Sequence, residues 1–366
     1  MSAWAPLVPF AKARAGIDDG VLGLLLLCLG AGSIVTMPIA GALAARFGCR
    51  VVIALSAALL CAALPLLAVV ATLPMLVASL FVLGAGAGSI DVAMNIQAII
   101  VERASGRSMM SGFHGLFSLG GIAGAGGVTV LLAAGATPFA AIACVAAVII
   151  VALAAAARDL LPYGGETTGP VFAIPRGVVL FIGVLCFIAF LAEGAVLDWS
   201  AVFLTSVRDM AAAYAGLDYA AFALSMTIGR LIGDRSVQRF GGTNIILMGG
   251  LCSGFGFAIT ELVPFWQMTL LGFALVGVGS ANIVPVLFTS VGRQTTMAEN
   301  VAVPAITNTS LATSVGATQA ISAAIMPPIE CPTRWGRRSP KASTTSQPCK
   351  VKSSMSWRSS SPVDSP

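Results

Sequence analysis

Long apolar runs, separated by short polar gaps, dominate this sequence. Most are close to the length of about 20 residues that an α-helix needs to cross the hydrocarbon core of a bilayer. We interpret nine runs as convincing spans, at 20–44, 51–71, 75–100, 110–134, 137–157, 177–205, 211–233, 243–262 and 266–291, and a tenth, weaker one at 301–326 that polar side chains interrupt. This pattern predicts an all-α fold, a polytopic membrane helix bundle.

The composition agrees with a membrane protein and excludes a soluble one. Hydrophobic residues make up 57 % of the chain, charged residues 10 %, and the mean hydropathy is +0.95, whereas a soluble domain is about 25 % charged. The net charge of +5 comes from the last 40 residues, which hold seven Lys and Arg against two Asp and Glu. Because the rest of the chain is balanced, we expect the lipid bilayer as a partner and no nucleic acid.

Residue types that carry catalysis or bind metal are scarce. His114 is the only histidine, and the sequence has no CxxC pair, so we expect no metal site. The glycine cluster Gly84, Gly86 and Gly88 lies inside an apolar run with no Lys-Ser/Thr after it, which excludes a phosphate-binding loop. We therefore expect no enzyme activity and no cofactor.

The charges of the loops predict an orientation. If the turn at Arg46–Arg50 faces the cytoplasm, the alternate loops bring most of the arginines to the same side, namely Arg103, Arg107, Arg158, Arg176, Arg235, Arg239 and Arg293. The opposite loops hold Lys12, Arg14 and Arg208. This is the positive-inside pattern, and it predicts a multi-pass protein of the inner (plasma) membrane.

A polar segment rich in glycine and proline, residues 158–176, divides the sequence in two. We predict an N-terminal helix bundle at 1–157, a cytoplasmic linker at 158–176, a C-terminal helix bundle at 177–326 and a disordered basic Ser/Pro-rich tail at 327–366. Each bundle holds a basic turn of related sequence, GALAARFGCR at 41–50 and GRLIGDRSVQRFG at 229–241. Two repeated helical halves are a known transporter architecture.

These two turns resemble the signature of the major facilitator superfamily, a Gly, then an Asp-Arg, then a Gly followed by basic residues. The first turn matches it at Gly41, Arg46, Gly48 and Arg50, but has Ala45 where the family has Asp. The second keeps Asp234 and Arg235, with Arg230 in place of the leading Gly. The resemblance implies that these residues form gating turns, in which the acidic residue holds helix ends together. Because Ala45 replaces this acid, the first turn lacks the group for that function.

Two further stretches, SGFHGLFSLGG at 111–121 and AEGAVLDWSAVFL at 192–204, are similar to a bacterial, sugar-permease-like branch of the fucose-permease type. The family normally has twelve spans, arranged as two pseudo-symmetric halves, so about nine or ten full spans make this bundle incomplete. We expect a truncated first helix from a misplaced start codon. We also expect that a reading-frame error produced the basic tail, with a genuine disordered tail as the alternative.

Acidic residues inside the spans are candidates for function, because a charge in the bilayer interior is costly unless it faces a polar cavity or a partner. Asp91 and Asn95 fall on one helix face; the alternative is a hydrogen-bonded pair that holds helices together. Glu193 is the better candidate for proton coupling. Asp198, five residues on, points about 140° away and could instead sit beside Trp199 at the membrane interface.

Two uncharged polar residues complete the candidate set. His114 could change protonation near neutral pH, although a lone histidine is more often a local hydrogen-bond donor. Asn282 is a polar residue in mid-span, and Pro285 after it should loosen the helix, which favours a contact with substrate.

The sequence as a whole favours a secondary active transporter of a small solute. We expect alternating access between two halves, coupling to protons through Glu193 or Asp91, and action as a monomer. The alternative is a non-transporting membrane protein or an inactive transporter remnant.

Overall fold

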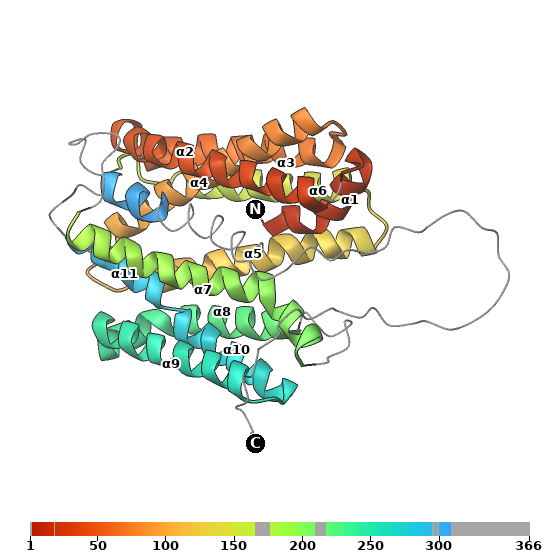
Figure 1. The fold of residues 1–366 in the computed structure, drawn as a ribbon. Helices are drawn as coiled ribbons and strands as arrows, with labels where there is room; N and C mark the ends of the chain where they lie inside the picture. The colour runs from red at the N-terminus through yellow and green to blue at the C-terminus, as the bar shows by residue number, and fades with distance from the viewer. Residues whose placement is uncertain are drawn as a thin grey trace, which may run out of the picture. The chain divides into compact units, whose positions relative to one another are not determined.

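The computed structural model describes residues 2–17, 19–164, 176–208, 217–294, 297 and 300–308. Over these residues the regular structure is helical throughout (Figure 1), which confirms the predicted fold class. In chain order the elements are η1 (Ser2–Leu7), α1 (Val8–Ala15), α2 (Asp19–Phe47), α3 (Cys49–Val69), α4 (Leu73–Ser105), α5 (Met110–Ala133), α6 (Pro138–Ala156), α7 (Val178–Ser206), α8 (Leu217–Phe240), α9 (Gly242–Leu262), α10 (Trp266–Ser280) and α11 (Ile283–Arg293). Residues 300–308 are also helical.

Eight stretches of the described helices are long and apolar enough to cross a membrane. Each of the nine convincing spans has a helical counterpart, but α8, which matches the prediction at 211–233, is not among the eight. Its second half carries Arg230, Asp234 and Arg235, too much charge for an apolar span. The run at 266–291 is divided into α10 and α11 at Ala281 and Asn282. Residues 165–175 of the linker, and 309–326 of the tenth run, lie outside the described residues.

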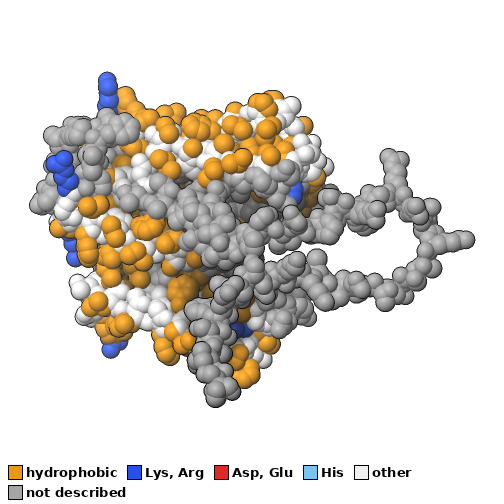
Figure 2. Space-filling view, viewed as in Figure 1, with side chains coloured by type: hydrophobic (Ala, Val, Ile, Leu, Met, Phe, Trp, Pro, Cys, Tyr) orange, Lys and Arg blue, Asp and Glu red, His pale blue; other side chains and the backbone are white. Residues whose placement is uncertain are grey.

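Apolar side chains cover the outer surface of the helices. Val151 is 69 % exposed and Leu251 75 % exposed, each facing away from the bundle. Figure 2 shows hydrophobic side chains across the described part of this face, with the basic side chains near the helix ends. Lipid would cover such a band, which would be an aggregation liability in water.

Small residues let α2 and α4 approach closely. A Cβ on Gly84 would overlap the backbone of Leu29, and one on Gly88 would lie 2.7 Å from Ser33 Cα. The Ser33 hydroxyl donates a hydrogen bond to the Gly84 carbonyl at 2.8 Å. Interfaces of this type hold membrane helices together through backbone contact, so these glycines are structural.

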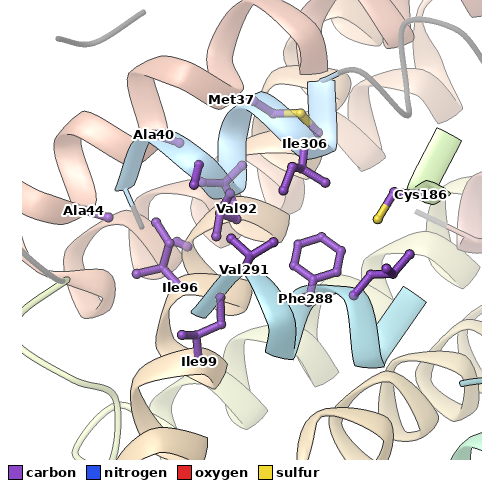
Figure 3. Close-up of a cluster of buried hydrophobic side chains, with 14 of the residues drawn as sticks. Met37, Ala40, Ala44, Val92, Ile96, Ile99, Cys186, Phe288, Val291 and Ile306 are labelled. Carbon is purple, nitrogen blue, oxygen red and sulfur yellow. The ribbon is translucent and has the colours of Figure 1, made fainter. Parts of the chain in front are cut away.

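We call the helices before residue 165 the N-terminal helices and those after residue 175 the C-terminal helices. One apolar cluster joins the two sets. Figure 3 shows α11 placing Phe288 and Val291 beside side chains of α4 and α2. We call this cluster the apolar seam; its labelled members are Met37, Ala40, Ala44, Val92, Ile96, Ile99, Cys186, Phe288, Val291 and Ile306. All are buried, so the two sets of helices share an apolar core.

Candidate functional site

Arg230 of α8 is buried and joins three other segments of the bundle. Its Nη2 lies 3.4 Å from Glu193 Oε1 of α7, its Nη1 donates to Ser118 Oγ of α5 at 2.9 Å, and its Nε donates to the carbonyl of Ala281 at 3.3 Å. We call these four residues the Arg230 site. It connects an N-terminal helix, α5, with α7, α8 and the junction between α10 and α11. Figure 1 shows α5 running between the two sets of helices.

The ion pair at this site is loose. A good Arg–carboxylate contact measures about 2.7–2.9 Å and often uses two parallel hydrogen bonds, whereas here one pair of atoms meets at 3.4 Å. The Arg230 side chain is 9 % exposed and that of Glu193 19 %. Both charges therefore lie inside the bundle without the tight geometry of a structural salt bridge.

Proline chemistry explains why the Ala281 carbonyl is available. In an unbroken helix this carbonyl would accept a hydrogen bond from the backbone N–H four residues later. That residue is Pro285, which has no N–H. The helix breaks between Ser280 and Ile283, and Arg230 Nε takes the free acceptor.

Asn282 lies at the same break and faces α8. Its Nδ2 donates to the Gly229 carbonyl at 3.0 Å. Its Oδ1 is buried with no hydrogen-bond partner among the described atoms, and it lies so close to Gly233 that a Cβ there would overlap it. In this conformation Asn282 holds the broken helix against α8.

His114 lies one turn before Ser118 on α5. The Ser118 hydroxyl donates to the His114 carbonyl at 3.0 Å, while the imidazole is 5.8 Å from the Phe288 ring. Its Nε2 is buried and has no hydrogen-bond partner among the described atoms. A buried polar atom without a partner is unusual in a folded protein, so this nitrogen still has the capacity for one hydrogen bond.

The other acidic candidates lie apart from Arg230. Asn95 Nδ2 donates to Asp91 Oδ1 at 3.2 Å and to the Asp91 carbonyl at 2.9 Å, as expected for neighbours on one helix face. No hydrogen bond or ion pair among the described residues connects this pair to Arg230. The side chain of Asp198 is outside the described part of α7.

The second basic turn, at 229–241, contacts the opposite set of helices through a carboxylate. Asp234 accepts hydrogen bonds from the backbone N–H groups of Ser111 at 3.0 Å and Gly112 at 2.9 Å. These are free donors in the first turn of α5, where the helix dipole favours negative charge. Glu102 of α4 accepts from Met109 and Met110 N–H, both at 2.8 Å. Arg235 is exposed.

The first basic turn, at 41–50, contacts the C-terminal residues by close packing. A Cβ on Gly41 would overlap the Asn300 carbonyl and lie 2.6 Å from Pro304 Cγ. Gly48, with a φ of 88°, turns the chain against Pro162. Arg50 donates to the carbonyls of Leu160 and Arg158 at 2.8 and 2.9 Å.

The other arginine of this first turn, Arg46, does not take part in the seam. Arg46 is exposed, with its guanidinium 5.2 Å from the centroid of the Phe47 ring. With Ala45 at the acidic position, the turn itself offers no carboxylate to the helix at 300–308.

The sequence reasoning missed Ser118, Glu102 and the Ala281 carbonyl, and it placed Arg230 in a gating turn. The structure adds that the Arg230 guanidinium lies beside Glu193, and its part in gating stays a prediction. One signal for the carbonyl was present, because Pro285 stands four residues after Ala281. The partners of Arg230 come from separate helices, and no local pattern connects them.

Comparison with known proteins decides the family. Residues 1–325 match the profile of the Major Facilitator Superfamily. The chain belongs to this superfamily. It is 55 % identical over 308 residues to an uncharacterized MFS-type transporter of Yersinia pestis, covering 84 % of this chain and 80 % of the relative. It is 29 % identical to the membrane protein MosC of Rhizobium meliloti, covering 82 % and 74 %.

Solved structures of the superfamily share the fold. The E. coli fucose:proton symporter superposes with a TM-score of 0.71 at 14 % identity, covering 88 % of this chain and 86 % of that one. A proton:xylose symporter gives a TM-score of 0.69 at 12 % identity, covering 88 % and 85 %. The protein is therefore a multi-pass membrane protein of a transporter family, and the fucose-permease-type resemblance fits these neighbours.

Proposed function

We propose that this protein is a proton-coupled secondary transporter of a small solute in the bacterial inner membrane. The observation that carries the proposal is the Arg230 site, where a carboxylate of α7 and a hydroxyl of α5 meet one buried arginine. A charge inside a membrane bundle is costly, and a group that changes its charge there can couple proton binding to a change in helix contacts. The fold relatives described as fucose:proton and proton:xylose symporters support proton coupling.

Alternating access would use residues 1–157 and 177–326 as the two rocking halves, connected by the linker at 158–176, with 327–366 as a tail. The hydrogen bonds and close glycine contacts between α5 and α8 among the described residues lie in the first nine residues of α5: Ser111 and Gly112 with Asp234, Gly115 with Leu231, and Ser118 with Arg230. Further along α5, Gly121 and Gly124 face Ser2 and Ala3 instead. This arrangement supports a state that is closed at the cytoplasmic end.

Glu193 is the proposed proton site. When ionised, its carboxylate is attracted to Arg230 and ties α7 to α8; when protonated, it loses most of that attraction. Glu193 then no longer holds the Arg230 side chain in place, so the contact of Arg230 with Ser118 of the other half can change. Asp91 is the second candidate, because its hydrogen bond from Asn95 also depends on which of its oxygens carries a proton.

Reconstitution into liposomes that contain a pH-sensitive dye tests the proposal. With no imposed pH gradient, an inward gradient of a transported solute should acidify the lumen. A screen of sugars, organic acids and amino acids would identify the solutes that do so. Glu193→Gln should abolish acidification while solute exchange across the membrane continues, because the neutral amide mimics the protonated acid.

The matched control is Glu261→Gln, which makes the same chemical change on an exposed side chain at the end of α9. It should leave acidification unchanged. Full acidification by Glu193→Gln would remove Glu193 from the coupling mechanism, and Asp91→Asn then becomes the decisive variant. The absence of solute movement in the unaltered protein across the whole screen would favour the non-transporting alternative.

A further inference from the structure

The charges of the Arg230 site point to the class of solute. We infer that the protein carries a small organic monocarboxylate, whose carboxylate group binds the Arg230 guanidinium when Glu193 holds a proton. This inference rests on the proposed function and names the substrate class of the same site. It follows from the hydrogen-bonding capacity of Arg230, from the charge balance around it and from the unpartnered nitrogen of His114.

Arg230 has hydrogen bonds to spare. A guanidinium carries five N–H groups, and the described contacts engage it through three: to Glu193, to Ser118 and to the Ala281 carbonyl. The contact with Glu193, at 3.4 Å, is the longest. A planar carboxylate can receive two parallel N–H bonds from such a group, so a carboxylate ligand would be held better than Glu193 is held now.

The charge balance selects an anion with a single charge. Among the described residues at the site, Arg230 and Glu193 carry the charges, and the site is neutral while Glu193 is ionised. The other titratable groups around them, His114 of α5, Cys186 of α7 and Tyr219 of α8, are types that bring no negative charge near neutral pH. When Glu193 takes up a proton, one positive charge remains, which a monocarboxylate neutralises and a neutral sugar does not.

Phosphate groups fit this site less well than carboxylates. A phosphate carries close to two charges near neutral pH, which one arginine does not balance. The described contacts place no second basic side chain at the Arg230 site. A carboxylate matches both the single charge and the planar geometry of the guanidinium.

His114 adds a preference for a hydroxyl group on the solute. Its buried Nε2 has no hydrogen-bond partner among the described atoms, and it lies one turn from Ser118, which Arg230 contacts directly. A hydroxylated acid could bind Arg230 through its carboxylate and His114 through a hydroxyl. We therefore expect hydroxy acids or sugar acids to bind more tightly than simple fatty acids.

The transport step exchanges one partner of Arg230 for another without covalent chemistry. A proton from the solution binds to a Glu193 oxygen, the attraction to Arg230 weakens, and the carboxylate of the solute takes that place. One proton and one monoanion then cross together, so net charge movement is zero. Release on the other side reverses both bindings.

Ligand-induced thermal stabilisation of the purified protein provides the first test, with matched pairs of probes: gluconate against glucose, galacturonate against galactose, and lactate against propionate. We expect gluconate, galacturonate and lactate to stabilise the protein more strongly in acidic than in alkaline buffer, glucose and galactose to have no effect, and propionate, which lacks the hydroxyl group, to stabilise it less than lactate does. Glu193→Gln should bind the acids equally well in both buffers. Arg230→Gln should not bind them, and Arg230→Lys, which keeps the charge but not the fork, should bind at least about tenfold more weakly.

Arg293→Gln is the matched control, because Arg293 is exposed at the end of α11 and lies away from the site. It should bind the acids as the unaltered protein does. If Arg230→Gln proves unstable, Arg230→Lys and the pH dependence of Glu193→Gln still decide the question.

Uptake measurements separate this inference from the proposed function. With a radiolabelled acid that binds, a membrane potential imposed by valinomycin and potassium should not change the rate of proton-coupled uptake. Neutral sugars that acidify the lumen and stabilise the protein as well as their acids would overturn the inference and leave the proposed function intact. Failure of every acid in the panel to stabilise the protein in acidic buffer would also overturn it.

Discussion

The two basic turns, at 41–50 and 229–241, have related sequences but contact the opposite set of helices by different means. The second turn presents a carboxylate, Asp234, to two free N–H groups of α5. The first presents a bare backbone at Gly41 to the Asn300 carbonyl and to Pro304. One contact is electrostatic and directional, and the other depends on steric fit.

This difference shows that a turn at this place in the fold can contact the other set of helices either through a carboxylate or through close packing. Both turns contact the beginning of a helix from the other set, so the two contacts have a similar place in the fold. The favourable interaction of a carboxylate with helix N–H groups remains in the second turn alone, because Ala45 occupies the acidic position of the first. Arg50 instead binds carbonyls at 158–160, within its own set of helices.

Asp234→Asn should have the largest effect, because it removes the charge from two hydrogen bonds that hold the sets of helices together. Hydrogen bonds to charged groups are worth about 1.5–3 kcal/mol each, and the amide could retain one weaker bond. We expect the contact between the second turn and α5 to be about 2–3 kcal/mol less favourable in free energy. Cross-linking of a Ser108→Cys, Gln238→Cys pair would measure this, since the Gln238 amide lies 3.4 Å from the Ser108 carbonyl.

Asp159→Asn serves as the control for this experiment. Asp159 is exposed at the start of the linker, and its substitution should leave the cross-linking rate unchanged. A rate in Asp234→Asn equal to that of the unaltered contact would show that the second turn is no stronger than the first.

At the other ends of α3 and α9 the two sets of helices use the same kind of contact. Arg14 donates to the carbonyls of Leu67, Ala68 and Val70 at the end of α3. Arg208 donates to the carbonyls of Thr260 and Glu261 at the end of α9. These are two of the three basic residues that the charge pattern left on the non-cytoplasmic side, and capping a helix C-terminus explains their presence there.

Arg14→Gln and Arg208→Gln should therefore destabilise the protein to a similar extent. The loss of charge-assisted bonds to helix carbonyls predicts about 1–2 kcal/mol for each, measured as a decrease in thermal stability in detergent. Arg107→Gln, on an exposed loop, should have no effect. An effect of one cap several times larger than that of the other would contradict the match between these two ends.

The sequence predicted the helices well because span length and apolar character are local properties. It also singled out Glu193, since a carboxylate between apolar residues is costly wherever it lies. It did not pair Glu193 with Arg230, because that contact depends on how α7 and α8 pack. Its place in the family signature assigned Arg230 to the second basic turn, and that match carries no information about a partner on α7. The partners Ser118 and Ala281 come from further segments still.

Gly41→Ala tests the steric contact of the first turn. A Cβ would overlap the Asn300 carbonyl, and overpacking of this kind costs about 1–3 kcal/mol. We expect a cost of about 1 kcal/mol, at the lower end because one methyl group is added, and a slower cross-linking rate for the Ser108→Cys, Gln238→Cys pair. Gly126→Ala is the control, because no described atom lies within 4 Å of its added methyl group. Equal cross-linking in Gly41→Ala and Gly126→Ala would mean that the first turn does not contribute to closure.

Ala45→Asp should have the smallest effect. It tests whether the missing carboxylate is the only difference between the two turns. A carboxylate there would stand on the turn that already meets the helix at 300–308, where an acid near a helix N-terminus is worth about 0.3–1 kcal/mol. We expect it to restore part of the cross-linking rate that Asp234→Asn loses, whereas Ala45→Asn, which is uncharged, should restore less. Equal rescue by Asp and Asn would show that the duplicated turns differ in geometry as well as in charge.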